Sequence, residues 1–303
     1  MNRPASLAVG LVTVPVLLAS SAGGVPADST RGVLATSSSD PLVSVAGDIA
    51  CGTKVPAYDG GAGTLTECRQ RYTSRLILDS DAVWTLGDHV YPTASLEQFR
   101  AVYRPTWGRM KAVTFPTPGD HDYGKTAGKG YFSYFDRRPY YTFAMGGWRV
   151  LSLNSEINHS ANSAQVRWLR RKLASTNAHC IAAYFSTPRW TSGPRAPGDA
   201  SFNPFWKALY AAHADLVIGG DTHNYERFAK QTPTGAHAAD GIRQFVVGSG
   251  GRNLYGFPHV QPHSQVRKMS FGVLQLRLHR NAYGWRFVNQ AKRVLDSGSK
   301  TCN

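Results

Sequence analysis

Four short apolar segments of the chain each end in glycine followed by acidic or imidazole side chains. They cover residues 43–48, 82–91, 113–123 and 215–228. Apolar runs of this length predict buried strands, and glycine lets the backbone turn sharply where each strand stops. One Gly-Asp after a strand is usually only a turn. Four such ends in one chain are typical of an open α/β sheet that gathers its chemistry at the carboxyl ends of its strands.

The side chains at these four ends favour a metal site. They are carboxylates and imidazoles, and no cysteine lies among them. Oxygen and nitrogen donors clustered without thiolates suit hard or borderline metal ions. We therefore predict that Asp48, Asp88 and His223 converge on a cation at one edge of a layered sheet.

The N-terminus predicts export. Arg3 precedes an apolar run, Leu7 to Ala19, and small residues follow it, which is the pattern of a signal peptide. The run is too short to span a bilayer comfortably. We expect a signal peptide over residues 1–29, a disordered linker over 30–40 and one domain over 41–303. The mature protein would then be secreted and carry no transmembrane anchor.

Four cysteines fit an exported protein with disulfides. Cys51, Cys68, Cys180 and Cys302 allow three pairings. The preferred one joins Cys51 to Cys68, which closes a loop rich in glycine and threonine, and leaves Cys180 for Cys302.

The formal net charge is +15. A basic exported protein can favour anionic substrates or surfaces, although solubility alone explains the charge equally well. The sequence contains no arginine-rich run or nucleic-acid motif. The expected partner is a phosphorylated small molecule or another anionic substrate.

Periodicity predicts the main elements. The clearest amphipathic helix covers 162–175. Further helices are expected over 69–80, 95–104 and 202–212, a hairpin over 140–153, and strands over 181–185, 243–247, 271–278 and 284–288.

The order of motifs resembles the calcineurin-like metallophosphoesterases. The motifs are Gly-Asp, Gly-Asp-X-X-Tyr, Gly-Asp-His-Asp and Gly-X-X-His-Asn-Tyr-Glu-Arg. Tyr91, three residues after Asp88, makes the purple-acid-phosphatase branch the best match. The resemblance runs from about residue 41 to 303. It implies an α/β (α+β) fold, a four-layer α-β-β-α sandwich, with a two-metal centre of a phosphatase at the strand ends.

The resemblance also implies roles for individual residues. The first metal, expected to be iron, would take Asp48, Asp88, Tyr91 and His223. Asp88 would bridge to the second metal, and His121 would lie near the substrate phosphate as the catalytic imidazole.

The second metal site departs from the family pattern. Asp120 stands where the family has asparagine, and Ser186 and Asp221 stand where it has histidines. The remaining carboxylates of Asp88, Asp120 and Asp221 could hold Mg²⁺, Mn²⁺, Ca²⁺ or Zn²⁺. Otherwise the site is empty, and the crowded carboxylates would take up a proton.

Two functions follow from this pattern. The first is a secreted metal-dependent phosphoesterase that hydrolyses phosphomonoesters or diesters with a metal-activated hydroxide. The alternative is a catalytically weak or inactive protein of the same fold that binds a metal or an anionic ligand. Further possible contacts to metal or substrate are Ser186, His89, Arg189 and Tyr225.

Overall fold

The computed structural model describes Met1 and residues 40–303. The expected signal peptide and nearly all of the expected linker lie outside the described residues. The described residues from 40 onward belong to one compact unit. Among them, no helix is both long enough and apolar enough to cross a bilayer.

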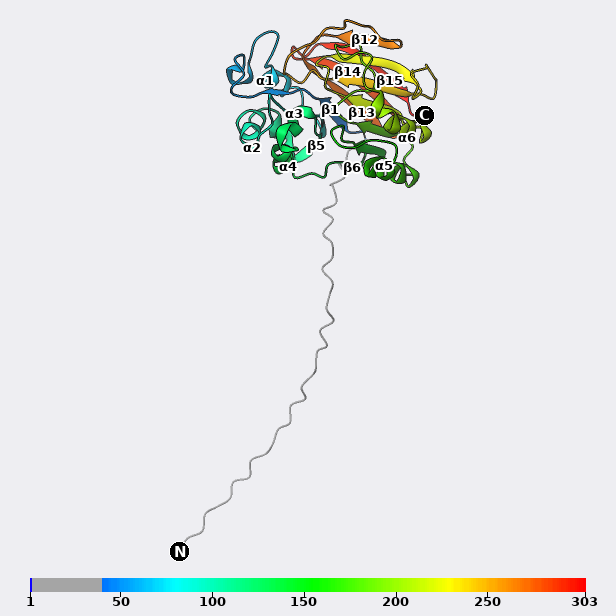
Figure 1. Ribbon diagram of the computed structural model, residues 1–303, viewed down its shortest axis with the longest axis horizontal. Helices are drawn as coiled ribbons and strands as arrows, with labels where there is room; N and C mark the ends of the chain where they lie inside the picture. Colours follow the sequence, from blue (N-terminus) through cyan, green and yellow to red (C-terminus); the bar gives the residue numbers. More distant parts are fainter. Residues whose placement is uncertain (2–39) are drawn as a thin grey trace. The chain divides into compact units, whose positions relative to one another are not determined.

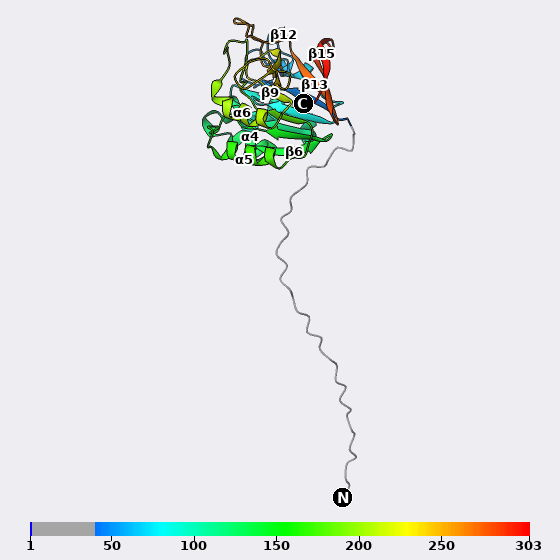
Figure 2. The same cartoon turned by 90° about the vertical axis from the view of Figure 1, so that its right-hand side faces the viewer.

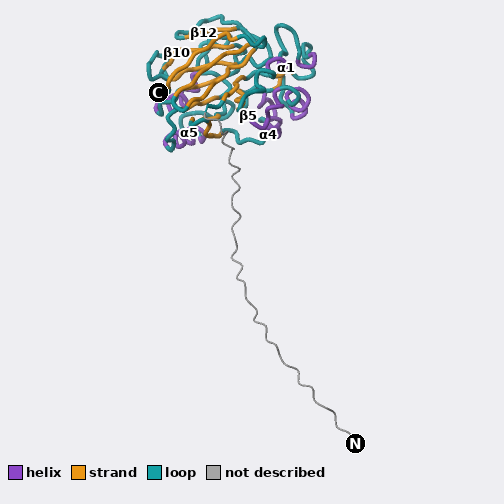
Figure 3. The backbone as a smooth tube through the Cα atoms, turned by 180° about the vertical axis from the view of Figure 1, so that it is seen from behind, coloured by secondary structure: helices purple, strands orange, loops and turns teal. Residues whose placement is uncertain are grey.

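Two β-sheets form the centre of this unit (Figure 3). The first sheet is mixed: β1, β3 and β5 are parallel, and β13, β14 and β15 continue it antiparallel. Its strand order is β15 (Val294–Thr301), β14 (Ala282–Asn289), β13 (Gly272–His279), β1 (Leu42–Ala46), β3 (Ala82–Leu86), β5 (Thr114–Thr117).

The second sheet has a parallel centre made of β11, β9, β8 and β7. Its strand order is β12 (Ser264–Lys268), β10 (Tyr225–Gln231), β11 (Ile242–Val247), β9 (Leu216–Gly219), β8 (Ile181–Tyr184), β7 (Trp148–Ser152), β6 (Tyr141–Met145). The expected hairpin is confirmed, since β6 and β7 pair antiparallel on either side of two glycines. A short parallel pair, β2 (Ala50–Cys51) and β4 (Val90–Tyr91), lies beyond the ends of β1 and β3.

The sheets pack face to face through aromatic side chains. Trp84 of β3 stacks on Tyr184 of β8 with ring centroids 5.3 Å apart, and Tyr225 of β10 stacks on Phe287 of β14 at 4.0 Å. Each pair joins one sheet to the other. Offset stacks of this kind add roughly 0.5–1.5 kcal/mol to the burial of their area. The core between the sheets therefore fixes which strand ends meet at the shared edge.

Helices α5 (Ala164–Ala174) and α6 (Asn203–Ala211) cover the outer face of the second sheet, away from β13 and β15 (Figure 2). The predicted amphipathic helix is confirmed: Val166, Leu169 and Leu173 are buried, and its arginines and lysine point to solvent. Ser163 caps it by accepting a hydrogen bond from the Val166 amide at 3.2 Å. Such a cap is worth about 1 kcal/mol.

The remaining helices lie on the other side of the fold (Figure 1). They are α1 (Gln70–Thr73), α2 (Leu96–Gln98), α3 (Asp120–Tyr123) and α4 (Lys129–Phe135). The helix expected over 69–80 is shorter than predicted. Thr73 donates a hydrogen bond to the carbonyl of Gly250 at 2.5 Å, and the chain then turns so that Leu76 and Ile77 enter the core. The fold as a whole is the α+β sandwich expected from the sequence.

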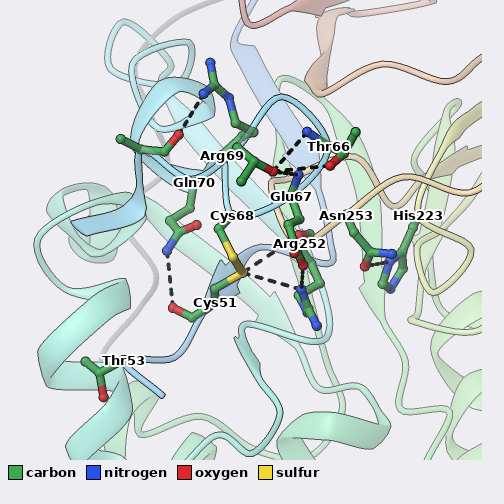
Figure 4. Close-up of a disulfide and its surroundings, with 12 residues drawn as sticks. Cys51, Thr53, Thr66, Glu67, Cys68, Arg69, Gln70, His223, Arg252 and Asn253 are labelled. Carbon is green, nitrogen blue, oxygen red and sulfur yellow. Dashed lines mark hydrogen bonds and ion pairs between the residues drawn. A yellow bond between two sulfur atoms is a disulfide. The ribbon is translucent and has the colours of Figure 1, made fainter. Parts of the chain in front are cut away.

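Both preferred disulfides are present. Cys51 pairs with Cys68, and Cys180 pairs with Cys302. The first closes the loop after β2, close to Arg252 and Asn253 (Figure 4). The second joins the start of β8 in one sheet to the end of β15 in the other.

Candidate metal centre

Four donor atoms from separate strand ends meet at one point. Tyr91 Oη lies 2.6 Å from Asp48 Oδ1, 2.7 Å from Asp88 Oδ2 and 3.0 Å from His223 Nε2. His223 Nε2 lies 2.9 Å from Asp48 Oδ1. Asp48 follows β1, Asp88 follows β3 and His223 follows β9. Tyr91 is the last residue of β4. The sheet topology thus brings together the four residues expected at the first metal.

This arrangement fits a metal ion. Ligands about 2.1 Å from a cation at right angles to each other lie about 3.0 Å apart, close to the separations found here. The carboxylates of Asp48 and Asp88 are 0% and 2% exposed. Buried charges of one sign need a counter-charge. A phenol, an imidazole and two carboxylates are a donor set that an iron or zinc ion accepts.

The backbone is strained at four of the expected ligands. Asp48, Asp88, Asp221 and His223 have φ values of 59°, 52°, 63° and 43°. Non-glycine residues rarely adopt this left-handed region, and such residues gather at functional sites where the surrounding structure holds them. Sharp turns at the strand ends direct these side chains to the shared edge.

Burial and charge shift the proton affinities of the site. Burial, with the charges of Asp48, Asp120 and Asp122, holds the pKa of Asp88 well above its ordinary value. Burial and the same Asp48 and Asp88 charges raise the pKa of Tyr91. Burial lowers the pKa of His223, but the Asp48 charge and the hydrogen bonds to Asp48 and Asn253 together outweigh it, so the net pKa is raised. A cation would replace these protons, because metal ligands bind in their deprotonated forms.

A second layer of residues orients His223. Its Nδ1 lies 2.7 Å from Asn253 Oδ1, so Nδ1 carries the proton and Nε2 presents its lone pair to the other donors. Tyr255 stacks on the imidazole with ring centroids 4.3 Å apart. Both residues follow β11. Neither residue is predicted from the sequence, because no spacing signal in the chain points to them.

A pocket of about 440 Å³ is lined by three of the four donor residues, Asp88, Tyr91 and His223. Asp120 and His121 line it, as do two arginines, Arg195 and Arg252. His121 Nδ1 is 2.8 Å from the carbonyl oxygen of Pro92, an acceptor. In the neutral ring Nδ1 therefore holds the proton, and Nε2 is the nitrogen left to exchange a proton.

The chain is similar to known phosphatases. No protein-family profile matches the chain. Purple acid phosphatase 21 of Arabidopsis thaliana is 30% identical over 158 residues, which is 48% of this chain and 35% of that protein. Purple acid phosphatase 22 of the same plant is 24% identical and covers 52% of this chain and 38% of its own length. The chain thus spans only a little over a third of these relatives.

Solved structures show the same fold. Purple acid phosphatase PPD1 from yellow lupin seeds superposes with a TM-score of 0.71 at 16% identity, over 89% of this chain and 55% of that one. GAP50 of Plasmodium gives 0.66 at 14% identity, over 87% and 89%. PhoD gives 0.57 at 14% identity, over 86% and 68%. The chain is thus similar in sequence, over about half of its length, and in fold to the purple acid phosphatases.

The purple acid phosphatase fold implies a two-metal centre, typically with iron. At the second position, two of the three side chains that replace the family's ligands are otherwise engaged or enclosed. Both oxygens of Asp221 lie against Arg195 Nη1, at 2.9 and 2.8 Å. Ser186 is buried, and Asp88 Oδ1 already accepts a hydrogen bond from the His121 amide at 3.0 Å. Donor atoms of Asp88, Asp120 and His121 do lie within 4.8 Å of one another.

Three further candidate contacts lie away from the pocket that Asp88, Tyr91 and His223 line. His89 is fully buried, and its ring nitrogens lie 2.7 Å from Thr85 Oγ1 and 2.7 Å from Asp122 Oδ2. This is a correction, because both ring nitrogens are already engaged. His89 instead joins the loop after β3 to α3.

The other two candidates are corrected for similar reasons. The buried hydroxyl of Tyr225 donates to Asp296 Oδ2 at 2.6 Å, on the side of the sheet that faces Phe287. Arg189 donates from Nε to Asn203 Oδ1 at 2.7 Å and lies 3.6 Å over the ring of Trp190. Neither side chain lines the pocket above the donors.

Proposed function

We propose that the chain is a secreted, metal-dependent phosphoesterase that hydrolyses phosphomonoesters or diesters. The observation that supports this most is the convergence of four buried donors beneath a pocket that carries two arginines. The phosphatase names of its relatives support the reaction class. The two disulfides agree with export.

The chain's own residues would divide the work as follows. Asp48, Asp88, Tyr91 and His223 would hold one cation, expected to be iron. When bound, such an ion supplies a polarised phosphoryl oxygen and a water of lowered pKa. His121, with Nδ1–H held on the Pro92 carbonyl, would act from its doubly protonated form. It would give the Nε2 proton to the leaving oxygen and remain as the neutral Nδ1–H ring. The arginines at the pocket would bind and orient the phosphate.

A second candidate function is a metal- or anion-binding protein with little or no catalysis. The pairing of Asp221 with Arg195 favours it, because this carboxylate is then not free for a second cation. One structural relative, GAP50, is described as an anchor in the inner membrane complex of Plasmodium.

Purified secreted protein, assayed with p-nitrophenyl phosphate and its bis ester across a panel of metals, separates the two functions. We expect hydrolysis that depends on added or retained metal. Asp48→Asn keeps a residue that tolerates the left-handed backbone but removes a charged ligand, so metal content and activity should fall together. His121→Ala should lower activity and keep the metal. Hydrolysis that survives Asp48→Asn would contradict the proposed site, and metal uptake without hydrolysis would favour the binding protein.

A further inference from the structure

The loop between β8 and α6 carries an arginine into the metal pocket. The guanidinium of Arg195 contacts both oxygens of Asp221 through Nη1, at 2.9 and 2.8 Å. The Asp221 side chain is 4% exposed, whereas that of Arg195 is 60% exposed. A buried carboxylate thus anchors one end of a cation whose other end faces the pocket. A guanidinium has five N–H donors, so its Nε and Nη2 remain for a ligand.

This guanidinium pairs with a carboxylate that the sequence assigns to the second metal. The other two carboxylates of that assignment, Asp88 and Asp120, line the same pocket as Arg195. One positive charge of the protein thus already pairs with Asp221. Arg195 and Asp221 line the pocket together with His121.

The loop that presents the arginine is held at its base. The buried carboxylate of Glu226 accepts hydrogen bonds from the amide of Ser192, at 2.8 Å, and from its hydroxyl. Within the loop, the Gly198 amide donates to the Arg195 carbonyl at 2.9 Å. An anchored loop loses little entropy when its arginine binds a ligand.

We propose that Arg195 takes the place of the second metal ion, so that the chain has one metal and one guanidinium where two-metal phosphoesterases have two metals. The phosphate of the substrate would lie between the cation held by Asp48, Asp88, Tyr91 and His223 and the free N–H groups of Arg195. A planar guanidinium suits this role, because its parallel donors match two phosphate oxygens. This inference rests on the proposed function and names the phosphate-binding group of the same site.

Two measurements on the secreted protein test it without an activity assay. Mass spectrometry of native protein counts the ions, and titration calorimetry with inorganic phosphate measures anion affinity. We expect about one ion per chain. Loss of a charge-assisted contact should weaken phosphate binding about 10- to 100-fold in Arg195→Ala. Arg195→Lys should recover part of the loss, because it keeps the charge and not the fork.

Arg167→Ala is the matched control, since Arg167 is an exposed arginine of α5 and its loss changes the net charge equally. Phosphate affinity should stay within about twofold of wild type there, because the charge lies outside the pocket. Two ions per wild-type chain, or unchanged phosphate affinity in Arg195→Ala, would overturn the role of Arg195 and leave the first metal centre in place. No ion at all would instead overturn the proposed function, and the phosphate titration of that metal-free protein would still decide the role of Arg195.

Discussion

Asn253 should control metal affinity although it is not itself a ligand. Its Oδ1 accepts the proton of His223 Nδ1 at 2.7 Å, and this proton keeps Nε2 free to bind. In Asn253→Ala the Nδ1–H loses its acceptor. The His223 side chain is only 6% exposed, so water replaces the acceptor poorly. An unpaired buried donor costs about 1–3 kcal/mol.

That cost falls on the metal-bound state, because only this state requires the proton on Nδ1. The metal-free ring can shift its proton to Nε2 and donate it to a carboxylate instead. A cost of about 1–3 kcal/mol corresponds to an affinity loss of about 5- to 150-fold, within the range known for residues that support metal ligands. Competition between the protein and a chromophoric chelator for Co²⁺ measures this loss.

Two variants act as controls. Asn253→Asp keeps an acceptor at the same place and should bind Co²⁺ at least as tightly as wild type. Asn289→Ala removes a buried side-chain amide, whose oxygen accepts hydrogen bonds from the backbone amides of Ala291 and Arg293 at 3.1 and 2.9 Å. Asn289 does not line the pocket. This substitution should lower stability and leave Co²⁺ affinity unchanged. Folded Asn253→Ala with wild-type affinity would refute the reasoning.

Three other predictions follow from the same structure. Iron-loaded protein should be coloured by its tyrosinate, and Tyr91→Phe should bleach the visible band while Asp48 and the other ligands still retain some iron. Removing the disulfide of Cys180 and Cys302, which spans 122 residues, should lower the free energy of unfolding in urea by about 5 kcal/mol. Removing the other disulfide, which closes a 17-residue loop, should lower it by about 3 kcal/mol. Equal losses would contradict the loop-entropy argument. Burial raises the pKa of Asp296, but hydrogen bonds from Arg227 and Tyr225 outweigh it, so the net pKa is lowered. Asp296 therefore stabilises the folded state above the unfolded pKa of about 3.9, and this stabilisation is lost as pH falls through the lower folded pKa. Asp296→Asn should lower the free energy of unfolding by about 1–3 kcal/mol at pH 7. Urea unfolding toward pH 3 should show a progressively smaller difference.

The sequence predicts the strands that end at the site because their pattern is strong. Buried parallel strands such as β1, β3 and β9 are continuous apolar runs that stop at glycine. Strands at the sheet edges carry no such signal. β15 is mostly exposed along Val294–Thr301, and β12 is only half-buried. Their places come from pairing with β14 and β10, which a local pattern does not contain.

The same division holds within the site. Asp48, Asp88, Tyr91 and His223 are recognisable because each lies at a fixed offset from a strand-ending glycine. Arg195, Arg252 and Asn253 come from irregular loops, and only the tertiary fold places them. His89 is the converse case, a residue predicted near the site that does not reach it. Its neighbour Asp88 lies at the site, while the His89 side chain packs into an aromatic cluster that includes Tyr103 and Phe135. Adjacent residues at a tight turn diverge, so proximity in sequence overstates proximity in space.

The left-handed turns at Asp48, Asp88, Asp221 and His223 restrict how this protein can change over evolution. Aspartate, asparagine, histidine and glycine tolerate that geometry far better than alanine, valine or leucine. A lineage that abandons metal chemistry would therefore drift first among these few residue types. Asp221, at the position where the family pattern has histidine, keeps this left-handed geometry with φ at 63° and presents a carboxylate in place of an imidazole.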